Sequence, residues 1–167
     1  IGIFHADPVP RIIHSDAVLK SGTIALHPGS GSKSKNWPEE FWIELISLLL
    51  EQENMELMIV GGEAETKRVR RLGSKFPNPR LRLLLNKPLT NVVHELGGCR
   101  IFIGHDSGIT HLAAALGVRC VILWAQTNNK VWGPPGEKIH ILKPYNNTTP
   151  IEPRAVFQIV KNFVSIH

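Results

Sequence analysis

The chain has 167 residues, enough for a single domain with a complete hydrophobic core. Hydrophobic residues make up 43% of it and charged residues 20%, an ordinary balance for a globular protein. The net charge of +5 suits an anionic ligand or acceptor, but the sequence has no Lys/Arg blocks interleaved with aromatic residues, which argues against a nucleic-acid partner.

Residues 1–22 follow neither the helical nor the strand period, and they contain Pro8, Pro10 and Gly22. We predict that they form a linker or lead-in segment, and that one domain covers residues 23–167. The chain begins at Ile1 rather than at a methionine, so we expect it to be a fragment whose natural start lies upstream.

From residue 23 onward, apolar runs of strand length alternate with helical patterns. Short loops between alternating strands and helices indicate parallel βαβ units, so the predicted fold is α/β, a Rossmann-like doubly wound parallel sheet. In chain order we predict a strand at 23–27, a helix at 36–52, a strand at 55–60, a helix at 63–76, a strand at 80–85, a helix at 89–98, a strand at 100–104, a helix at 106–117, strands at 120–125 and 138–142, and a helix at 153–166.

Two of these helices carry clear signals at their ends. Asn36 and Glu39 have the spacing of a capping box, and Pro38 is tolerated in a first turn. Gly117 is expected to end the helix at 106–117. The first helix has an apolar stripe that should face the core, made of Phe41, Trp42, Leu45, Ile46 and Leu49.

Cysteines and apolar runs limit the class of protein further. Cys99 and Cys120 are isolated, so they predict buried thiols in a reducing compartment rather than a metal or redox site. Arg119 interrupts the longest apolar run, and no transmembrane segment is expected.

In a doubly wound sheet, ligands bind beyond the carboxyl ends of the strands, near the point where the strand order reverses. Three predicted loops leave such strand ends and carry unusual polar residues. They are His27–Asn36, Gly61–Glu65 and Gly104–Thr110.

The first loop reads HPGSGSKSKNWP. It meets neither the P-loop pattern, which needs a glycine before Lys-Ser, nor the dinucleotide fingerprint, which needs a third glycine. It still offers the parts of an anion cradle: backbone N–H groups at Gly29 and Gly31, hydroxyls at Ser30 and Ser32, and a charge at Lys33 or Lys35. The residues alone leave two interpretations open, a phosphate cradle and a plain solvated turn.

The loop GHDSGITH opens a helix, which Asp106 or Ser107 could cap. Gly108 in the first turn costs about 1 kcal/mol against alanine, and close approach of a ligand such as a pyrophosphate would explain it. The spacing misses the nucleophile elbow of serine hydrolases by one residue. A metal shared by His105, Asp106 and His111 is not expected, and a single helical histidine such as His111 is more often structural.

The third loop contains Glu63 and Glu65. An acidic residue after the second strand of a mononucleotide-binding unit often accepts hydrogen bonds from ribose hydroxyls. Negative charge at a helix N-terminus is an equally good explanation, so both remain open.

Together these loops resemble the family 9 glycosyltransferases, the ADP-heptose:lipopolysaccharide heptosyltransferases. The segments HPGSGSKSKNWP, IVGGEAE, GHDSGITHLAAALG and VWGPPG occur in the family's order and spacing, over roughly residues 23 to 143. The resemblance implies one half of a GT-B architecture, namely the carboxy-terminal domain that binds the nucleotide-sugar donor. The family's amino-terminal domain, which binds the acceptor and carries the expected general base, has no match here. The isolated chain should therefore bind donor without transferring sugar.

Carried over by position, the resemblance assigns roles to residues of the three loops. Those matched to the donor's phosphates are Ser30, Gly31, Ser32, Lys35, Ser107 and Gly108, with Lys35 preferred to Lys33 because it precedes x-Trp-Pro. Those matched to the ribose or sugar are Glu63 or Glu65, Asp106 and His111. The catalytic base is expected in the missing domain.

The implied function is transfer of heptose from ADP-heptose to a lipopolysaccharide core acceptor, with no cofactor and no metal. The implied partners are the nucleotide sugar and, through the missing domain, a lipid-linked saccharide. These substrates imply a cytoplasmic location and leave open peripheral contact with the inner membrane. Residues 125–129 depart from the Gly-Pro-Thr of many relatives, so two alternatives stay open: a GT-B enzyme with another nucleotide sugar, and a non-catalytic nucleotide-binding module.

Overall fold

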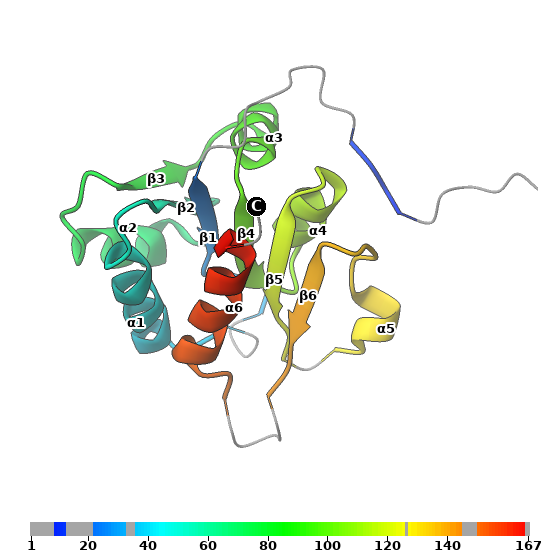
Figure 1. Ribbon diagram of the computed structural model, residues 1–167. Coiled ribbons are helices and arrows are strands. Elements are labelled where there is room, and N and C mark those ends of the chain that lie inside the picture. Colours follow the sequence, from blue (N-terminus) through cyan, green and yellow to red (C-terminus); the bar gives the residue numbers. More distant parts are fainter. Residues whose placement is uncertain (1–8, 13–21, 33–35, 126, 145–149, 166–167) are drawn as a thin grey trace, which may run out of the picture.

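The computed structural model describes residues 9–12, 22–32, 36–125, 127–144 and 150–165. Within these ranges, one six-stranded sheet carries helices on both faces (Figure 1). The strands are β1 Thr23–His27, β2 Glu56–Gly61, β3 Leu81–Leu85, β4 Ile101–His105, β5 Arg119–Leu123 and β6 Ile139–Leu142. The helices are α1 Glu39–Leu50, α2 Thr66–Ser74, α3 Leu89–Gly97, α4 Gly108–Ala115, α5 Asn129–Trp132 and α6 Pro153–Ser165.

The strands lie in the order β3-β2-β1-β4-β5-β6, and every neighbouring pair is parallel. Ile24 of β1 pairs with Leu57 of β2 on one side and with Ile101 of β4 on the other. The chain therefore moves outward from β1 in one direction and returns to extend the sheet in the other. The loops that follow β1 and β4 diverge at this reversal, which leaves a crevice at their carboxyl ends. The predicted doubly wound α/β fold is confirmed.

Two hydrophobic cores form because side chains alternate between the faces of each strand. Ile24 and Leu26 pack on one face with α1, α2 and α6, whereas Ala25 packs on the other face with α3 and α4. The predicted stripe of α1 is confirmed, since Trp42, Leu45, Ile46 and Leu49 are fully buried and Phe41 packs against them in part. With both faces covered, the inner strands are continuously apolar rather than alternating.

The predicted capping box at the start of α1 is wrong. The helix begins at Glu39, Pro38 occupies the N-cap position in an extended conformation, and no side chain caps the helix. A residue before proline avoids the helical region, so Trp37 does not form the first helical residue that a cap at Asn36 would need. The Glu39 carboxylate instead accepts two hydrogen bonds from Arg71 Nε on α2, at 2.7 and 3.0 Å.

Gly117 ends α4 as expected. Its φ of +71° is left-handed, its N–H donates to Ala114 O, and Val118 N–H donates to Ala113 O. These two bonds make a Schellman motif, which satisfies the last carbonyls of the helix.

The four-residue α5 was not predicted from the sequence. Asn128 starts it by accepting a hydrogen bond from Lys130 N–H at 3.0 Å. One helical turn is too short to show a hydrophobic period. Among the helices of the described ranges, none is long and apolar enough to cross a membrane.

The segment before the sheet touches α4. Ile12 N–H donates to the carbonyl of Ala115 at 2.8 Å, and the first strand begins at Thr23. Most of residues 1–22 lie outside the described ranges, so the boundary between a linker at 1–22 and a domain at 23–167 stays a prediction.

Candidate functional site

A cavity of about 280 Å³ opens where the strand order reverses. Its walls come from the loops that follow β1, β2, β3 and β4 and from the starts of α3 and α4. The residues that line it are His27, Ser30, Gly31, Val60, Gly61, Gly62, Glu65, Lys87, Val92, Ser107, Gly108 and Ile109. All three loops singled out in the sequence therefore meet in one place.

The loop after β1 curls on itself at the edge of this cavity. Ser30 Oγ donates to Ser32 O at 2.7 Å and accepts from Ser32 N–H at 3.4 Å. Of the predicted phosphate-binding residues in this loop, Ser30 and Gly31 line the cavity, and Ser32 does not. Lys33 and Lys35 lie outside the described residues.

Gly29 lets this loop pack against the loop after β2. A Cβ atom on Gly29 would lie 2.2 Å from Cγ of Glu65, so any other residue would displace the glutamate. Glu65 lines the cavity and accepts a hydrogen bond from Gly62 N–H at 3.1 Å. Glu63 is exposed and does not line the cavity, so the structure separates the two glutamates that the sequence left equal.

At the start of α4, Ser107 and Gly108 both line the cavity. Ser107 is the N-cap, although its hydroxyl meets Thr110 Oγ1 at 3.2 Å rather than a backbone N–H. A Cβ on Gly108 would meet no atom within 4 Å, and Gly108 is not among the residues of positive φ. Among the residues that the structure describes, neither packing nor backbone conformation explains this glycine.

Asp106 lies beside these residues and bonds within the protein. Its Oδ2 accepts from the hydroxyl of Thr127 at 2.7 Å, and Thr127 O accepts from Trp124 Nε1 at 2.6 Å. The carboxylate thus joins the loop after β4 to the loop after β5. It does not line the cavity, so its predicted contact with a sugar stays a prediction.

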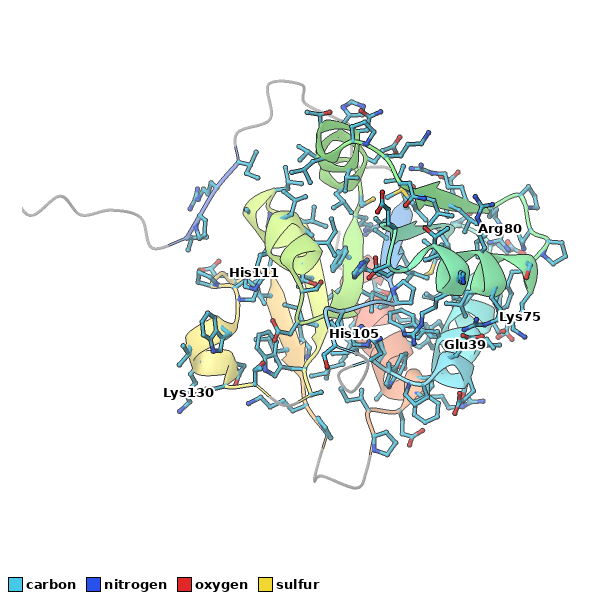
Figure 2. All side chains as sticks on the ribbon, turned by 180° about the vertical axis from the view of Figure 1, so that it is seen from behind. Glu39, Lys75, Arg80, His105, His111 and Lys130 are labelled. Atoms are coloured by element: carbon cyan, nitrogen blue, oxygen red, sulfur yellow. The ribbon has the colours of Figure 1, made fainter. Side chains whose placement is uncertain are left out.

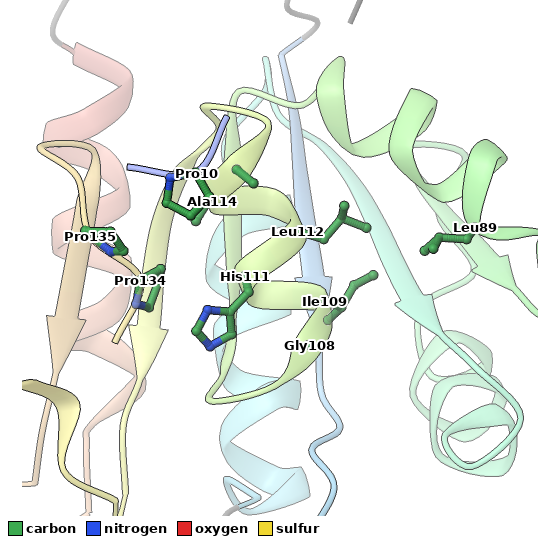
Figure 3. A pocket seen from close by; sticks show the side chains of 10 residues that line it. Pro10, Leu89, Gly108, Ile109, His111, Leu112, Ala114, Pro134 and Pro135 are labelled. Atoms are coloured by element: carbon green, nitrogen blue, oxygen red, sulfur yellow. The ribbon is translucent and has the colours of Figure 1, made fainter. Parts of the chain in front are cut away.

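His111 borders a second, larger cavity of about 550 Å³ on the other side of the α4 start (Figure 3). This cavity is largely apolar, with Pro134 and Pro135 facing His111 and with Leu89 across from Leu112. The two cavities share only Gly108 and Ile109 among their lining residues. His111 is exposed, and it does not line the cavity that Ser107 and Glu65 line.

Two histidines at the strand ends are buried, and burial lowers the pKa of His27 and of His105 to about 4. Both rings are therefore neutral at pH 7 and add no positive charge to the site. Cys99 and Cys120 are buried and unpaired, and burial raises the pKa of each thiol to about 12. Neither cysteine has the thiolate character of a nucleophile.

The described part of the chain holds no cluster of three or more His, Cys, Asp and Glu side chains that could bind a metal. The grouping of His105, Asp106 and His111 is therefore not a metal cluster in this structure.

A sequence model of glycosyltransferase family 9 (heptosyltransferase) matches residues 6–155. The chain belongs to glycosyltransferase family 9. It is 32% identical over 119 residues to lipopolysaccharide heptosyltransferase 1 of Pseudomonas aeruginosa, and 29% identical over 125 residues to the Escherichia coli K12 protein of that name. These alignments cover 71% and 74% of the chain but only 33% and 39% of the relatives. The chain spans well under half the length of these curated relatives.

Solved family 9 structures share the fold. The E. coli heptosyltransferase WaaC with ADP superimposes with a TM-score of 0.78 at 25% identity, covering 86% of this chain and 45% of that one. WaaC with ADP-2-deoxy-2-fluoro heptose gives a TM-score of 0.74, with 86% and 44% covered. E. coli heptosyltransferase II gives 0.77 at 20% identity, with 87% and 47% covered.

Of the positions that family 9 membership singled out, the structure brings Ser30, Gly31, Glu65, Ser107 and Gly108 to one cavity. Sequence reasoning missed Lys87 and Val92 in its wall. The sequence could have indicated this loop, because ligands bind beyond the carboxyl ends of parallel strands and the loop after β3 also leaves such an end. That loop carries Asn86, held at a φ of +52°, directly before Lys87.

Proposed function

We propose that this chain is the donor-binding half of a family 9 glycosyltransferase, which moves heptose from ADP-heptose to a lipopolysaccharide core acceptor. The observation that carries the proposal is the convergence of Ser30, Gly31, Glu65, Ser107 and Gly108 on one cavity at the strand reversal. Similarity to heptosyltransferases whose structures hold ADP and an ADP-heptose analogue supports it.

The donor's diphosphate lies, in this proposal, between the loop at Ser30 and the start of α4. Unpaired backbone N–H groups of a helix N-terminus attract anions, and Ser107 adds a hydroxyl. Gly108 leaves open space where a side chain would otherwise stand. Cations come from Lys87 in the cavity wall and, by motif position, from Lys35.

Transfer needs the bond between the anomeric carbon and the β-phosphate oxygen to break as an acceptor hydroxyl forms a new bond to that carbon. Negative charge then develops on the departing β-phosphate. Helix N–H groups and a lysine stabilise that charge, because fixed donors act most strongly where charge develops. The proton of the acceptor hydroxyl goes to a base, which we place outside the part of the relatives that this chain matches.

Glu65 is the proposed acceptor for the ribose hydroxyls. Its carboxylate lines the cavity and is held in place by Gly62 N–H. The apolar surface for the adenine ring of the donor comes from Val60, Val92 and Ile109. Asp106 and His111 remain predictions for the sugar. His111 could meet the sugar only on the far side of Gly108, in the larger cavity.

Calorimetric titration of the chain with ADP, UDP and GDP tests this proposal. We expect ADP to bind more tightly than the other two. A preference for UDP or GDP would favour a different nucleotide sugar, as the departure at residues 125–129 allows. Failure of all three to bind would contradict the proposed function.

The acceptor and the location follow only from the family's substrates. We propose a lipid-linked saccharide acceptor, bound outside the part of the relatives that this chain matches, and action in the cytoplasm with peripheral contact at the inner membrane. Neither a cofactor nor a metal enters the proposed reaction. Incubation of the isolated chain with ADP-heptose and acceptor should give no transferred sugar, since we place the base outside these 167 residues.

A further inference from the structure

His105, the last residue of β4, touches both ends of the loop that follows β1. Its Nε2 accepts a hydrogen bond from Trp37 N–H at 2.8 Å, and its Nδ1 lies 3.2 Å from Gly29 O. The ring is only 1% exposed and stands edge-on to Trp42, with centroids 5.6 Å apart. Figure 2 shows His105 near the middle of the view and His111 beside α4; His105 is buried, whereas His111 is exposed.

These two partners allow only one form of the ring. A backbone N–H can only donate and a carbonyl can only accept, so Nε2 must be bare and Nδ1 must carry the proton. The other neutral tautomer would lose both hydrogen bonds, and the doubly protonated ring would lose the one from Trp37. Burial raises the cost of each loss, since water cannot replace the missing partner.

The same contacts decide which way the loop's peptide groups point. In a trans peptide the C=O and the next N–H point in opposite directions. Gly29 O faces His105, so Ser30 N–H points away from that ring. Pro28 O accepts from Arg68 Nη1 at 2.9 Å, which fixes the preceding peptide in the same manner. Two consecutive carbonyls are thus held by protein partners, and neither is free to turn toward an anion.

We propose that His105, protonated on Nδ1, is a positioning residue that holds Gly29 and Trp37 in place and keeps Ser30 N–H turned away from the ring and available to the donor's diphosphate. The inference rests on the proposed function for its ligand. It goes beyond that function because His105 touches the loop rather than the nucleotide. It also joins the two halves of the anion site, since Asp106 and Ser107 follow His105 directly and lead into α4.

Nuclear magnetic resonance of the free chain tests the tautomer without any ligand. Long-range ¹⁵N–¹H correlation at neutral pH should show His105 with a protonated Nδ1 and a bare Nε2. A protonated Nε2, or a mixture of both tautomers, would overturn the proposal. This measurement tests the positioning role of His105 even if the chain binds no ADP. Failure to bind ADP would contradict the proposed function alone.

Ligand titration tests whether the two hydrogen bonds of His105 support the binding of ADP. His105→Leu removes both hydrogen bonds, His105→Asn can still donate to Gly29 O, and His105→Gln can still accept from Trp37 N–H. We expect the dissociation constant for ADP to rise about tenfold or more in His105→Leu and less in the two amide variants. The constant for adenosine, measured by ligand-detected resonance, should change less than twofold, because adenosine lacks the phosphates that the loop would bind.

A core variant separates positioning from loss of stability. Leu49→Ala empties a fully buried site on α1 and should lower the melting temperature while leaving the ADP constant unchanged. An equal loss of ADP affinity in Leu49→Ala, or an equal loss of ADP and adenosine in the His105 variants, would overturn the positioning role. If His105→Leu does not fold, the Asn and Gln variants carry the same comparison.

Discussion

Two glycines of the candidate site, Gly29 and Gly108, differ in what surrounds them. At Gly29 the reason lies inside the protein, because the Glu65 side chain occupies the space of a Cβ. At Gly108 no atom of the described structure stands within 4 Å of a Cβ, and the backbone is not left-handed. A glycine that costs helix stability without an internal reason points to something outside the chain.

Gly108→Ala should therefore separate stability from binding. We expect the free energy of unfolding to stay the same or rise by up to about 1 kcal/mol, since alanine is the better helix former. The ADP dissociation constant should rise about tenfold, equivalent to about 1.4 kcal/mol, because the methyl group takes space from the diphosphate. Urea unfolding and calorimetry measure the two quantities.

Gly117→Ala is the matched control on the other end of α4. Its φ of +71° makes alanine strained, so the variant should lose about 1 kcal/mol of stability and keep its affinity for ADP. Unchanged ADP binding in Gly108→Ala would remove that residue from the site.

The two glutamates of the loop after β2 offer a second comparison. Glu65→Gln keeps an oxygen for Gly62 N–H but removes the charge, so nucleotide binding should weaken by about 1.5–3 kcal/mol, the scale for a charged hydrogen bond. Glu63→Gln should bind as the wild-type chain does. Titration with ADP measures both, and the reverse ranking would exchange their assignments.

Between elements, one arginine holds the end of α1 against the start of β3. Arg80 donates from Nη2 to Leu50 O and from Nη1 to Gln52 O, each at 2.5 Å. Longer bonds from Nη1 reach Glu53 O and Met55 O. The last carbonyls of a helix have no partner within the helix, and they carry the negative end of its dipole. A partly buried guanidinium suits them because its donors form a rigid fork.

Arg80→Ala should lower the free energy of unfolding by about 1.5–3 kcal/mol, because charged hydrogen bonds are lost and carbonyls are left without partners. Arg80→Lys should recover only part, since an ammonium group cannot form the fork. Urea unfolding measures these changes in the free energy of unfolding, provided that the m-value stays the same in the variants. Arg154→Ala is the control: its pair with Glu44, at 3.7 Å, is exposed and should contribute less than about 1 kcal/mol.

Helices and strands were predictable from the sequence where burial leaves a periodic apolar pattern. Helix ends and site residues were less predictable where contacts between individual side chains and backbone groups determine them. The stripe of α1 and the stop at Gly117 followed from apolar spacing and from the need for left-handed backbone. The capping box failed because the constraint on the residue before Pro38 outweighs the preference of Asn36 for a cap. In the candidate site, the packing of Gly29 against the next loop places Glu65, and not Glu63, in the cavity wall, and no local pattern in the sequence reveals that packing.

At the scale of the whole molecule, two buried histidines tie stability to pH. Burial lowers the pKa of His27 and of His105 from 6.5 to about 4, with Arg68 and the neighbouring His27 further lowering that of His105. Between pH 6.5 and pH 4 the unfolded chain therefore binds more protons than the folded chain. Stability is complete above this window and falls as the pH drops through it.

We expect each ring to cost about 3 kcal/mol of stability at pH 4 relative to pH 7. Urea unfolding across this range measures the slope, and His105→Asn should reduce it because one buried ring is gone. A flat profile in the wild-type chain would mean that the two rings are not buried as described.

Helix α4 connects two parts of the chain that are far apart in sequence. Its first residue, Gly108, borders both cavities, while its last, Ala115, is bonded to Ile12 in the segment that leads into the sheet. Eight residues of helix measure about 12 Å and behave as a stiff rod. Residues 9–12 are hydrogen-bonded to the same helix whose first residue lines both cavities. Pro10 of the same short segment also lines the larger cavity, so residues 9–12 help to form its wall as well as contacting the far end of α4.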